Sequence, residues 1–251
     1  MDKKYKLTKE MIEIDGRTLY RIKALRDFDN VKKGELGGFI EKEENLSHAG
    51  LCWVSENAKV YGRAMVRGNA EIYGNAEVCG YAKVSADAKV FGHAEIYGNA
   101  KVFGYAEVFG HAKVYDDANV YEHAKVSADA IVFGYAKVSG HAEIGTFARI
   151  TSPNDYIVIG PIGSRNGYTT VHRILNTDNQ SCSSDLRIQC GCFNGSPDEF
   201  FTKVDETHVE GTLYHAQYTT IVKPIVDAMS RINVCNITDK VGTMGSEINK
   251  D

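Results

Sequence analysis

Valine or isoleucine recurs at every sixth position of this chain, without interruption, from Val54 to Ile150. An alanine stands two residues before all but the first of these positions, beginning at Ala58 and ending at Ala148. So regular a period over so long a stretch indicates a repeat architecture, which has to be recognised before any single helix or strand is assigned. The repeat therefore limits what the middle of the chain can fold into.

Each repeat has the pattern of one short strand followed by one corner. Successive residues of a strand point to opposite sides, so Ala100 and Val102 face the same way while Lys101 between them points outward. In most repeats a glycine such as Gly104 follows two residues after the β-branched residue, and glycine allows a sharp turn of the backbone. The sequence predicts short strands around a core of alanine, valine and isoleucine.

This pattern resembles the left-handed β-helix of hexapeptide-repeat proteins, in which three repeats form one triangular coil. The resemblance implies a mainly β fold, with a left-handed parallel β-helix over residues 54–150. It also implies homotrimers, which are common in the family. We expect an N-terminal β-hairpin with capping coils over 1–53, a C-terminal α+β domain over 151–235 and a tail over 236–251.

The two flanking segments carry local signals of their own. Asp15-Gly16 separates two alternating segments, which predicts a hairpin, and a cap is needed because a solenoid end exposes unpaired strand edges. Ser196-Pro197 followed by two acids predicts the start of a helix that ends near His208. The other elements expected in the C-terminal domain are strands near 156–160, 168–173 and 186–193 and a helix over 213–232.

Both flanks resemble those of uncharacterised hexapeptide-repeat proteins from bacteriophages and their bacterial hosts. The resemblance rests on four blocks, at 19–22, 37–40, 159–165 and 190–193. It implies an accessory role and names no reaction. Because no apolar run has the length of a signal peptide or a membrane span, we expect a protein in the cytoplasm of the bacterial host.

Outward positions one coil apart should stack into columns, and several of these columns are rich in aromatic residues. Contiguous exposed apolar patches usually mark an interface between proteins. We therefore predict a homotrimer. The interface residues predicted from the aromatic columns are Tyr61, Tyr97, Tyr115, Phe133, Phe91 and Phe109.

Charged and imidazole side chains form further columns. One column alternates in sign, so neighbours one coil apart are expected to form weak ion pairs; it contains Glu71, Lys89, Glu107, Lys125 and Glu143. The histidines should also stack, His93 over His111 and His123 over His141. A metal site or an acid–base site is one interpretation of these pairs. Asn, Asp and Tyr occupy the same positions in other repeats, which favours structural corner residues.

Polar residues concentrate after the repeat, in a glycine-rich turn and the strand that follows it. Turn amides together with an arginine suit a phosphate or a carboxylate. The alternative is a plain glycine turn followed by exposed strand residues. The predicted ligand-binding residues are Ser164, Arg165, Asn166, Tyr168, Thr170, His172 and Arg173.

A zinc site formed by Cys182, Cys190, Cys192 and His208 is a weaker alternative, because a Cys-x-Cys spacing is tight and a full set of four ligands is not clearly supplied. We expect no metal, no cofactor and, with six scattered cysteines, free thiols. The net charge of −4 gives no basic excess, so duplex nucleic acid is not an expected partner.

Many enzymes of the hexapeptide-repeat family are acyltransferases that use acyl-coenzyme A and a histidine base. Their coils are commonly interrupted by a loop that shapes the acceptor pocket, whereas the repeats here continue without a break. We therefore assign no catalytic residue and expect a non-catalytic trimeric binding protein. It would be a phage accessory or anti-defence factor that sequesters a small anionic or nucleotide-like ligand or blocks a host protein. The alternative is an acyltransferase that uses acyl-coenzyme A.

Overall fold

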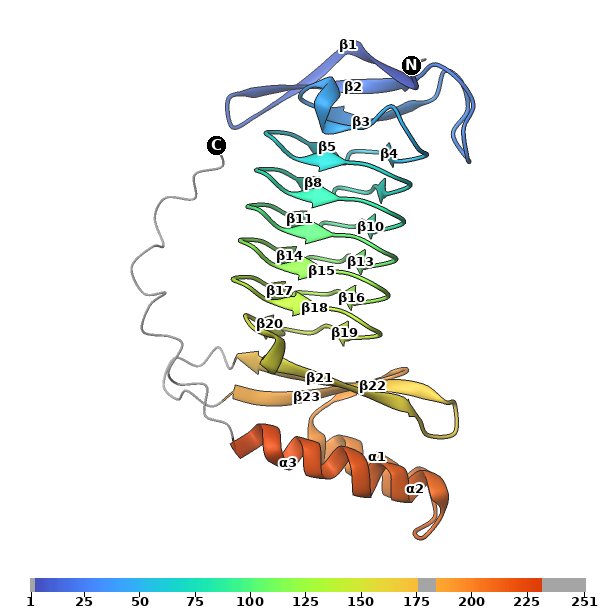
Figure 1. The fold of residues 1–251 in the computed structure, drawn as a ribbon, viewed down its shortest axis with the longest axis vertical. Coiled ribbons are helices and arrows are strands. Elements are labelled where there is room, and N and C mark those ends of the chain that lie inside the picture. Colours follow the sequence, from blue (N-terminus) through green and yellow to red (C-terminus); the bar gives the residue numbers. More distant parts are fainter. Residues whose placement is uncertain (1–2, 176–183, 232–251) are drawn as a thin grey trace, which may run out of the picture.

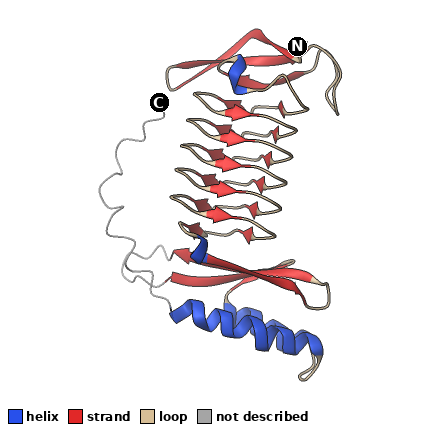
Figure 2. Ribbon diagram, in the orientation of Figure 1, coloured by secondary structure: helices blue, strands red, loops and turns tan. Residues whose placement is uncertain are grey.

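The computed structural model describes residues 3–175 and 184–231 of the chain. About six stacked parallel turns form a prism in the middle, between an N-terminal sheet at one end and a C-terminal sheet with helices at the other (Figures 1 and 2). The β-helix expected from the repeat is therefore confirmed as a parallel solenoid. Each turn consists of three two-residue strands joined by corners.

The prism has three faces, each a parallel sheet, which we name A, B and C. Within a face, a strand pairs with the strand one turn later, as Val90 pairs with Val108 and Val102 with Val120. Face A contains β5 (Lys59–Val60), β8 (Glu77–Val78), β11 (Glu95–Ile96), β14 (Lys113–Val114), β17 (Ile131–Val132) and β20 (Arg149–Ile150). Face B contains β4 (Trp53–Val54), β7 (Glu71–Ile72), β10 (Lys89–Val90), β13 (Glu107–Val108), β16 (Lys125–Val126) and β19 (Glu143–Ile144). Face C contains β6 (Met65–Val66), β9 (Lys83–Val84), β12 (Lys101–Val102), β15 (Asn119–Val120) and β18 (Lys137–Val138).

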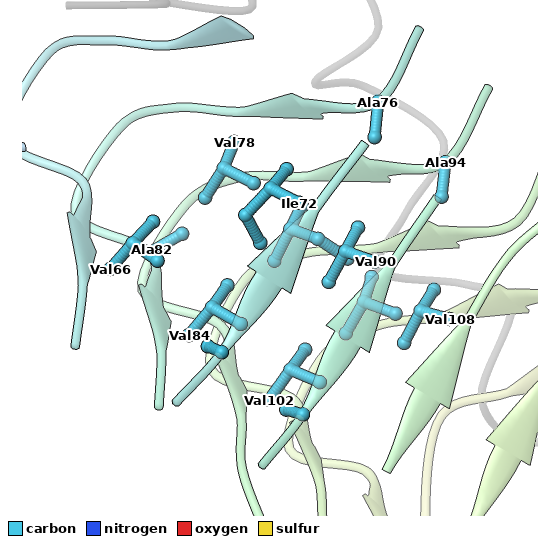
Figure 3. Close-up of a cluster of buried hydrophobic side chains, with 14 of the residues drawn as sticks. Val66, Ile72, Ala76, Val78, Ala82, Val84, Val90, Ala94, Val102 and Val108 are labelled. Carbon is cyan, nitrogen blue, oxygen red and sulfur yellow. The ribbon is translucent and has the colours of Figure 1, made fainter. Parts of the chain in front are cut away.

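The core of the prism consists of the alanine and the β-branched residue of every repeat. Ala76, Val78 and Ile72 lie in this core, and each is fully buried (Figure 3). Alanine leaves room for the larger residue beside it, so the three faces approach closely enough to exclude water. Burying a valine or isoleucine side chain contributes about 1.5–3 kcal/mol, which explains why the repeat tolerates no polar residue at these positions.

The corners depend on residues with positive φ. Gly104 has φ +74°, and a Cβ there would lie 2.8 Å from the backbone nitrogen of Glu122 in the next turn. Alanine nevertheless occupies the same corner one turn earlier, at Ala86, where φ is +59°. The corner geometry is thus set by the stacked turns, and glycine is the residue that adopts it with least strain.

The N-terminal cap is a hairpin of β1 (Tyr5–Ile14) and β2 (Arg17–Ala24), which confirms the turn expected at Asp15-Gly16. β2 pairs with β3 (Leu36–Ile40), and β3 pairs in parallel with β5. A short 3-10 helix, Glu43–Asn45, follows β3. Through β3 the cap becomes a continuation of face A, so the first edge of face A is covered by paired strands.

The C-terminal domain is a sheet of four antiparallel strands with helices on one side (Figure 2). A 3-10 turn, Pro153–Asp155, leads from the prism into it. The strands are β21 (Tyr156–Ile162), β22 (Gly167–Leu175), β23 (Ser184–Cys190) and β24 (Phe193–Gly195). One side of the sheet lies over the last turn of the prism, where Ala148 bridges to Ile174. The other side packs against the helices through residues such as Val171, Ile188 and Val222.

The helices follow the predicted order with one local difference. α1 (Pro197–Thr207) begins at the predicted cap, where Ser196 and Glu199 form a capping box. The second predicted helix is divided into α2 (Leu213–Gln217), a π-helical turn (Tyr218–Val222) and α3 (Lys223–Arg231). Pro224 lacks an N–H and its ring crowds the carbonyl four residues earlier, so the backbone widens just before it. The expected tail 236–251 lies outside the described residues.

Candidate functional site

The predicted anion-binding turn joins β21 to β22 at the rim of the C-terminal sheet. Ser164, Arg165 and Asn166 are all exposed there. The nearest polar atom recorded for the arginine is the thiol of Cys192, 3.9 Å from Nη1. The turn therefore presents the guanidinium of Arg165 at an exposed position.

The other predicted ligand-binding residues lie on β22. Successive side chains of this strand point to opposite sides of the sheet, which separates these residues. Tyr168 stacks on the ring of His141 of the prism, with ring centroids 4.1 Å apart. Thr170 points the same way, and its hydroxyl accepts a hydrogen bond of 3.0 Å from the backbone N–H of Glu143. Arg173 points to the opposite side of the sheet and donates to the carbonyl of Met229 in α3. The structure thus does not gather these side chains around one space.

His172 lies fully buried between the sheet and the last turn of the prism. Burial lowers the pKa of its imidazole to about 4, and Arg187, its direct neighbour on β23, adds a smaller effect in the same direction. The backbone carbonyl of Arg173, 3.4 Å from Nδ1, opposes the shift. Nε2 has no hydrogen-bond partner among the described residues. The imidazole is therefore neutral at pH 7 in its buried position.

The aromatic columns form continuous stacks on the outside of the prism. On face B, Phe91 lies 4.8 Å from Tyr73 and 4.9 Å from Phe109, measured between ring centroids. On face A, Tyr115 lies 4.8 Å from Tyr97 and 5.2 Å from Phe133. All of these rings are half-buried. Faces A and B thus each carry a stripe of three stacked rings, whereas the stack on face C is shorter, with Phe103 and Tyr121 5.1 Å apart between ring centroids.

Tyr61, also predicted at the interface, has a different environment. Its side chain is fully buried within its own chain, in a cluster with Leu19 of β2 and Phe39 of β3. The N-terminal cap therefore covers the first part of the face A column, and Tyr61 offers no accessible surface to a second copy.

The predicted charge column on face B forms ion pairs at two of its steps, Glu71 with Lys89 at 3.0 Å and Glu107 with Lys125 at 4.0 Å. Side chains of this degree of exposure contribute at most about 1 kcal/mol per pair. The column therefore contributes little to the stability of the prism.

The predicted histidine pairs are stacked as expected. The rings of His93 and His111 lie 4.9 Å apart, and those of His123 and His141 lie 5.1 Å apart. The second pair belongs to a longer column that begins at Tyr105 and ends at Tyr168 of the C-terminal domain. Within the described ranges, no cluster of three or more His, Cys, Asp or Glu side chains has the geometry of a metal site. Cys182, part of the weaker zinc hypothesis, lies outside these ranges.

A groove along face C has no counterpart among the sites predicted from the sequence. Its volume is about 750 Å³. The side chains that line it come from the strands of face C and from the adjoining corner: Arg63, Met65, Tyr81, Lys83, Asn99, Lys101, Asp117, Asn119 and Tyr135. Sorting the outward residues by face would have shown that the lysines of face C have no acid in the same column.

None of the helices in the described part of the chain is both long and apolar enough to span a membrane. The sequence matches no protein-family model and no curated protein.

Proposed function

We propose that the chain is a non-catalytic binding protein that works as a homotrimer. The observation that carries the proposal is the pair of aromatic stacks on two adjacent faces, Tyr73 to Phe109 on face B and Tyr97 to Phe133 on face A. Stacked, half-buried rings that repeat over several turns form a contiguous apolar stripe, and such stripes are typical of interfaces. A second copy would complete their burial.

The arrangement of the faces supports threefold symmetry. In the chain, each face B strand is followed by a corner and then by a face A strand, so the two faces meet along the edge that carries His93 and His111. In a cyclic trimer, one surface of each copy contacts a different surface of the next. Face A of one copy would pack against face B of its neighbour, with the histidine edge toward the axis. Face C would then remain on the outside.

The chemistry of the aromatic columns fits an interface of this kind. Burial raises the pKa of both Tyr97 and Tyr115, because their hydroxyls already lie in partly apolar surroundings within a single chain. The guanidinium of Arg149 lies 5.9 Å from the centroid of Phe133, near the C-terminal end of the same column. A partner can cover neutral hydroxyls at modest cost, and the ring of Phe133 gives the guanidinium of Arg149 a cation–π contact.

The proposal includes the finer features that the resemblance implies: a left-handed coil, a location in the cytoplasm of a bacterial host and a role as a phage accessory or anti-defence factor. Its ligand would be a small anionic molecule or a host protein. The unbroken prism, with its strands and corners following one another from β4 to β20, supports a binding function over acyl transfer.

Two measurements on the purified full-length chain test this function. The first is incubation with acetyl-coenzyme A and amine acceptors, for which we expect no transfer. Acetyl transfer that disappears in His93→Ala or His111→Ala would contradict the non-catalytic function. The second is denaturation of the protein followed by mass spectrometry of the released molecules, for which we expect a phosphorylated or carboxylated compound. Only neutral compounds, or none, would contradict an anionic ligand.

A further inference from the structure

Face C differs from the other two faces in the sign of its outward charges. On faces A and B, lysines are paired with glutamates one turn away, as in Lys113 with Glu95 and Lys89 with Glu71. The corresponding column on face C has no acid; it contains Met65, Lys83, Lys101, Asn119 and Lys137. None of its three lysines forms an ion pair with any residue that the structure describes.

This arrangement is unfavourable for the isolated prism. Lys83 and Lys101 are direct partners in adjacent parallel strands, and like charges directly opposite one another destabilise a sheet. Neighbouring strands are only about 4.8 Å apart, so the backbones of the two lysines lie next to one another on the same face. Faces A and B show that the repeat accepts glutamate at this position. The fold therefore does not require the unpaired lysines.

The groove beside the lysines is also lined with exposed aromatic rings. Tyr81 is 47% exposed and Tyr135 is 79% exposed, although a tyrosine ring is largely apolar. Arg63 holds Tyr81 in place with a hydrogen bond of 3.0 Å from Nη1 to the hydroxyl and with its guanidinium 5.1 Å from the ring centroid. Three turns separate the two tyrosines, which corresponds to about 14 Å along the prism. Asp117 is the one acid among the lining residues.

We propose that the face C groove, defined by the lining residues given above, binds single-stranded nucleic acid. Non-specific binding of single strands combines a positively charged groove that follows the phosphates with aromatic rings on which bases stack. Lys83 and Lys101 supply the charges within the groove, and Tyr81 and Tyr135 supply the rings. Lys137, one strand beyond Asn119, extends the positive column past the groove. Asn99 and Asn119 can form hydrogen bonds with base edges. An acidic peptide or a sulfated polysaccharide would match the lysines but would leave the rings without a flat aromatic partner.

The strand residues that line the groove lie on face C, which the proposed trimer interface leaves free, and the other lining residues lie on the corner between faces A and C. The low overall charge does not oppose this inference. The net charge of −4 sums over all surfaces, whereas a strand of phosphates would meet only face C. The exposed length of about 14 Å between the rings suits a few nucleotides.

The test is a fluorescence anisotropy titration of the full-length protein with a labelled oligothymidylate of about ten nucleotides, a length within the usual site size. The titration is repeated over a range of salt concentrations. Each phosphate contact contributes about 0.7 to the slope of log K against log salt for single strands. The double variant Lys83→Ala/Lys101→Ala should therefore lower the slope by about 1.4 and weaken binding at low salt at least tenfold.

The matched control is Lys89→Ala/Lys125→Ala, which removes the same number of lysines from the equivalent column of face B. It should bind like the wild type. Tyr135→Ala should weaken binding about five- to a hundredfold without changing the salt slope, because stacking carries no charge. Melting temperatures of all variants establish that each is folded. The face C double variant should melt no lower than the wild type, since it removes like-charge repulsion.

Three results would overturn the proposal. The first is the absence of binding to the oligonucleotide at low salt. The second is an equal loss of affinity in the face B and face C double variants, which would indicate general attraction to lysines. The third is unchanged affinity in Tyr135→Ala together with tighter binding of heparin or of a polyglutamate peptide, which would assign the groove to a polyanion without bases.

Discussion

His172 should make the stability of the C-terminal domain depend on pH. Burial lowers the pKa of its imidazole from about 6.5 in the unfolded chain to about 4 in the fold. Between these two values the unfolded chain binds a proton that the folded chain excludes. The free energy of unfolding therefore has its full value, as far as His172 is concerned, above pH 6.5, and it decreases as the pH falls toward 4.

The size of the effect follows from the same numbers. One pKa unit corresponds to about 1.4 kcal/mol, so the free energy of unfolding should fall by about 2.5 kcal/mol between pH 7.5 and pH 4.5 through this group alone. His172→Leu removes the proton-binding site and keeps an apolar side chain of similar size. The substitution also removes the buried Nε2 atom, which has no partner within the described residues. It should therefore change the free energy of unfolding very little at pH 7.5.

Urea unfolding at the two pH values, followed by circular dichroism, measures this difference. The free energy of unfolding of His172→Leu minus that of the wild type should be about 2.5 kcal/mol higher at pH 4.5 than at pH 7.5. Titrating groups that both proteins share cancel in this difference. His111→Leu removes an exposed imidazole from the prism and serves as the control, with no comparable change expected. Parallel pH profiles of wild type and His172→Leu would refute the buried neutral imidazole.

Two further predictions concern the prism and are measured by urea unfolding at neutral pH. Ile96→Ala should lower the free energy of unfolding by about 2–5 kcal/mol, because the side chain is fully buried; a loss below 1 kcal/mol would contradict the packed core. Ala86→Gly should raise it by about 1 kcal/mol and Gly104→Ala should lower it by a similar amount, because both corners have positive φ. Changes of the opposite sign would contradict the account of the corners.

The repeat made the prism predictable, because the positions of its core residues depend only on short-range alternation. Ala58 to Ile150 needed no knowledge of distant contacts, and neither did the turn at Asp15-Gly16 or the cap at Ser196. The π-helical turn is a different case. Pro224 was visible in the sequence, yet whether a helix stops, kinks or widens at a proline depends on what packs around it.

The surfaces were less predictable, because they depend on which long-range partner covers a residue. Tyr61 has the same place in its repeat as Tyr97, but strands from the N-terminal cap cover only the first of them. The strand signal around Tyr168 and His172 did not show which side of β22 would face the prism. These side chains lie on the side of the sheet that faces the prism. Polar residues that are neighbours in the sequence therefore point to opposite sides of the sheet.

The unpaired lysines of face C could not be recognised from the overall composition, because the total charge sums over all faces. Lys83 and Lys101 are unremarkable within the overall composition, and each resembles other repeat lysines such as Lys89. Their distinction is the absence of glutamate from the same column, which appears only when outward residues are sorted by face. Charge segregation among faces is the signal that sequence reasoning can use in other solenoids.

The trimer built on faces A and B is the central claim, and light scattering over a dilution series tests it most directly. The wild type should have three times the mass of one chain. Phe91→Asp should dissociate it, because the charge would be desolvated at the interface, while the column tolerates a polar residue at Ser127. Phe103→Asp, at the equivalent position on face C, should leave the trimer intact. A monomeric wild type, or a trimer broken by Phe103→Asp and not by Phe91→Asp, would contradict the claim.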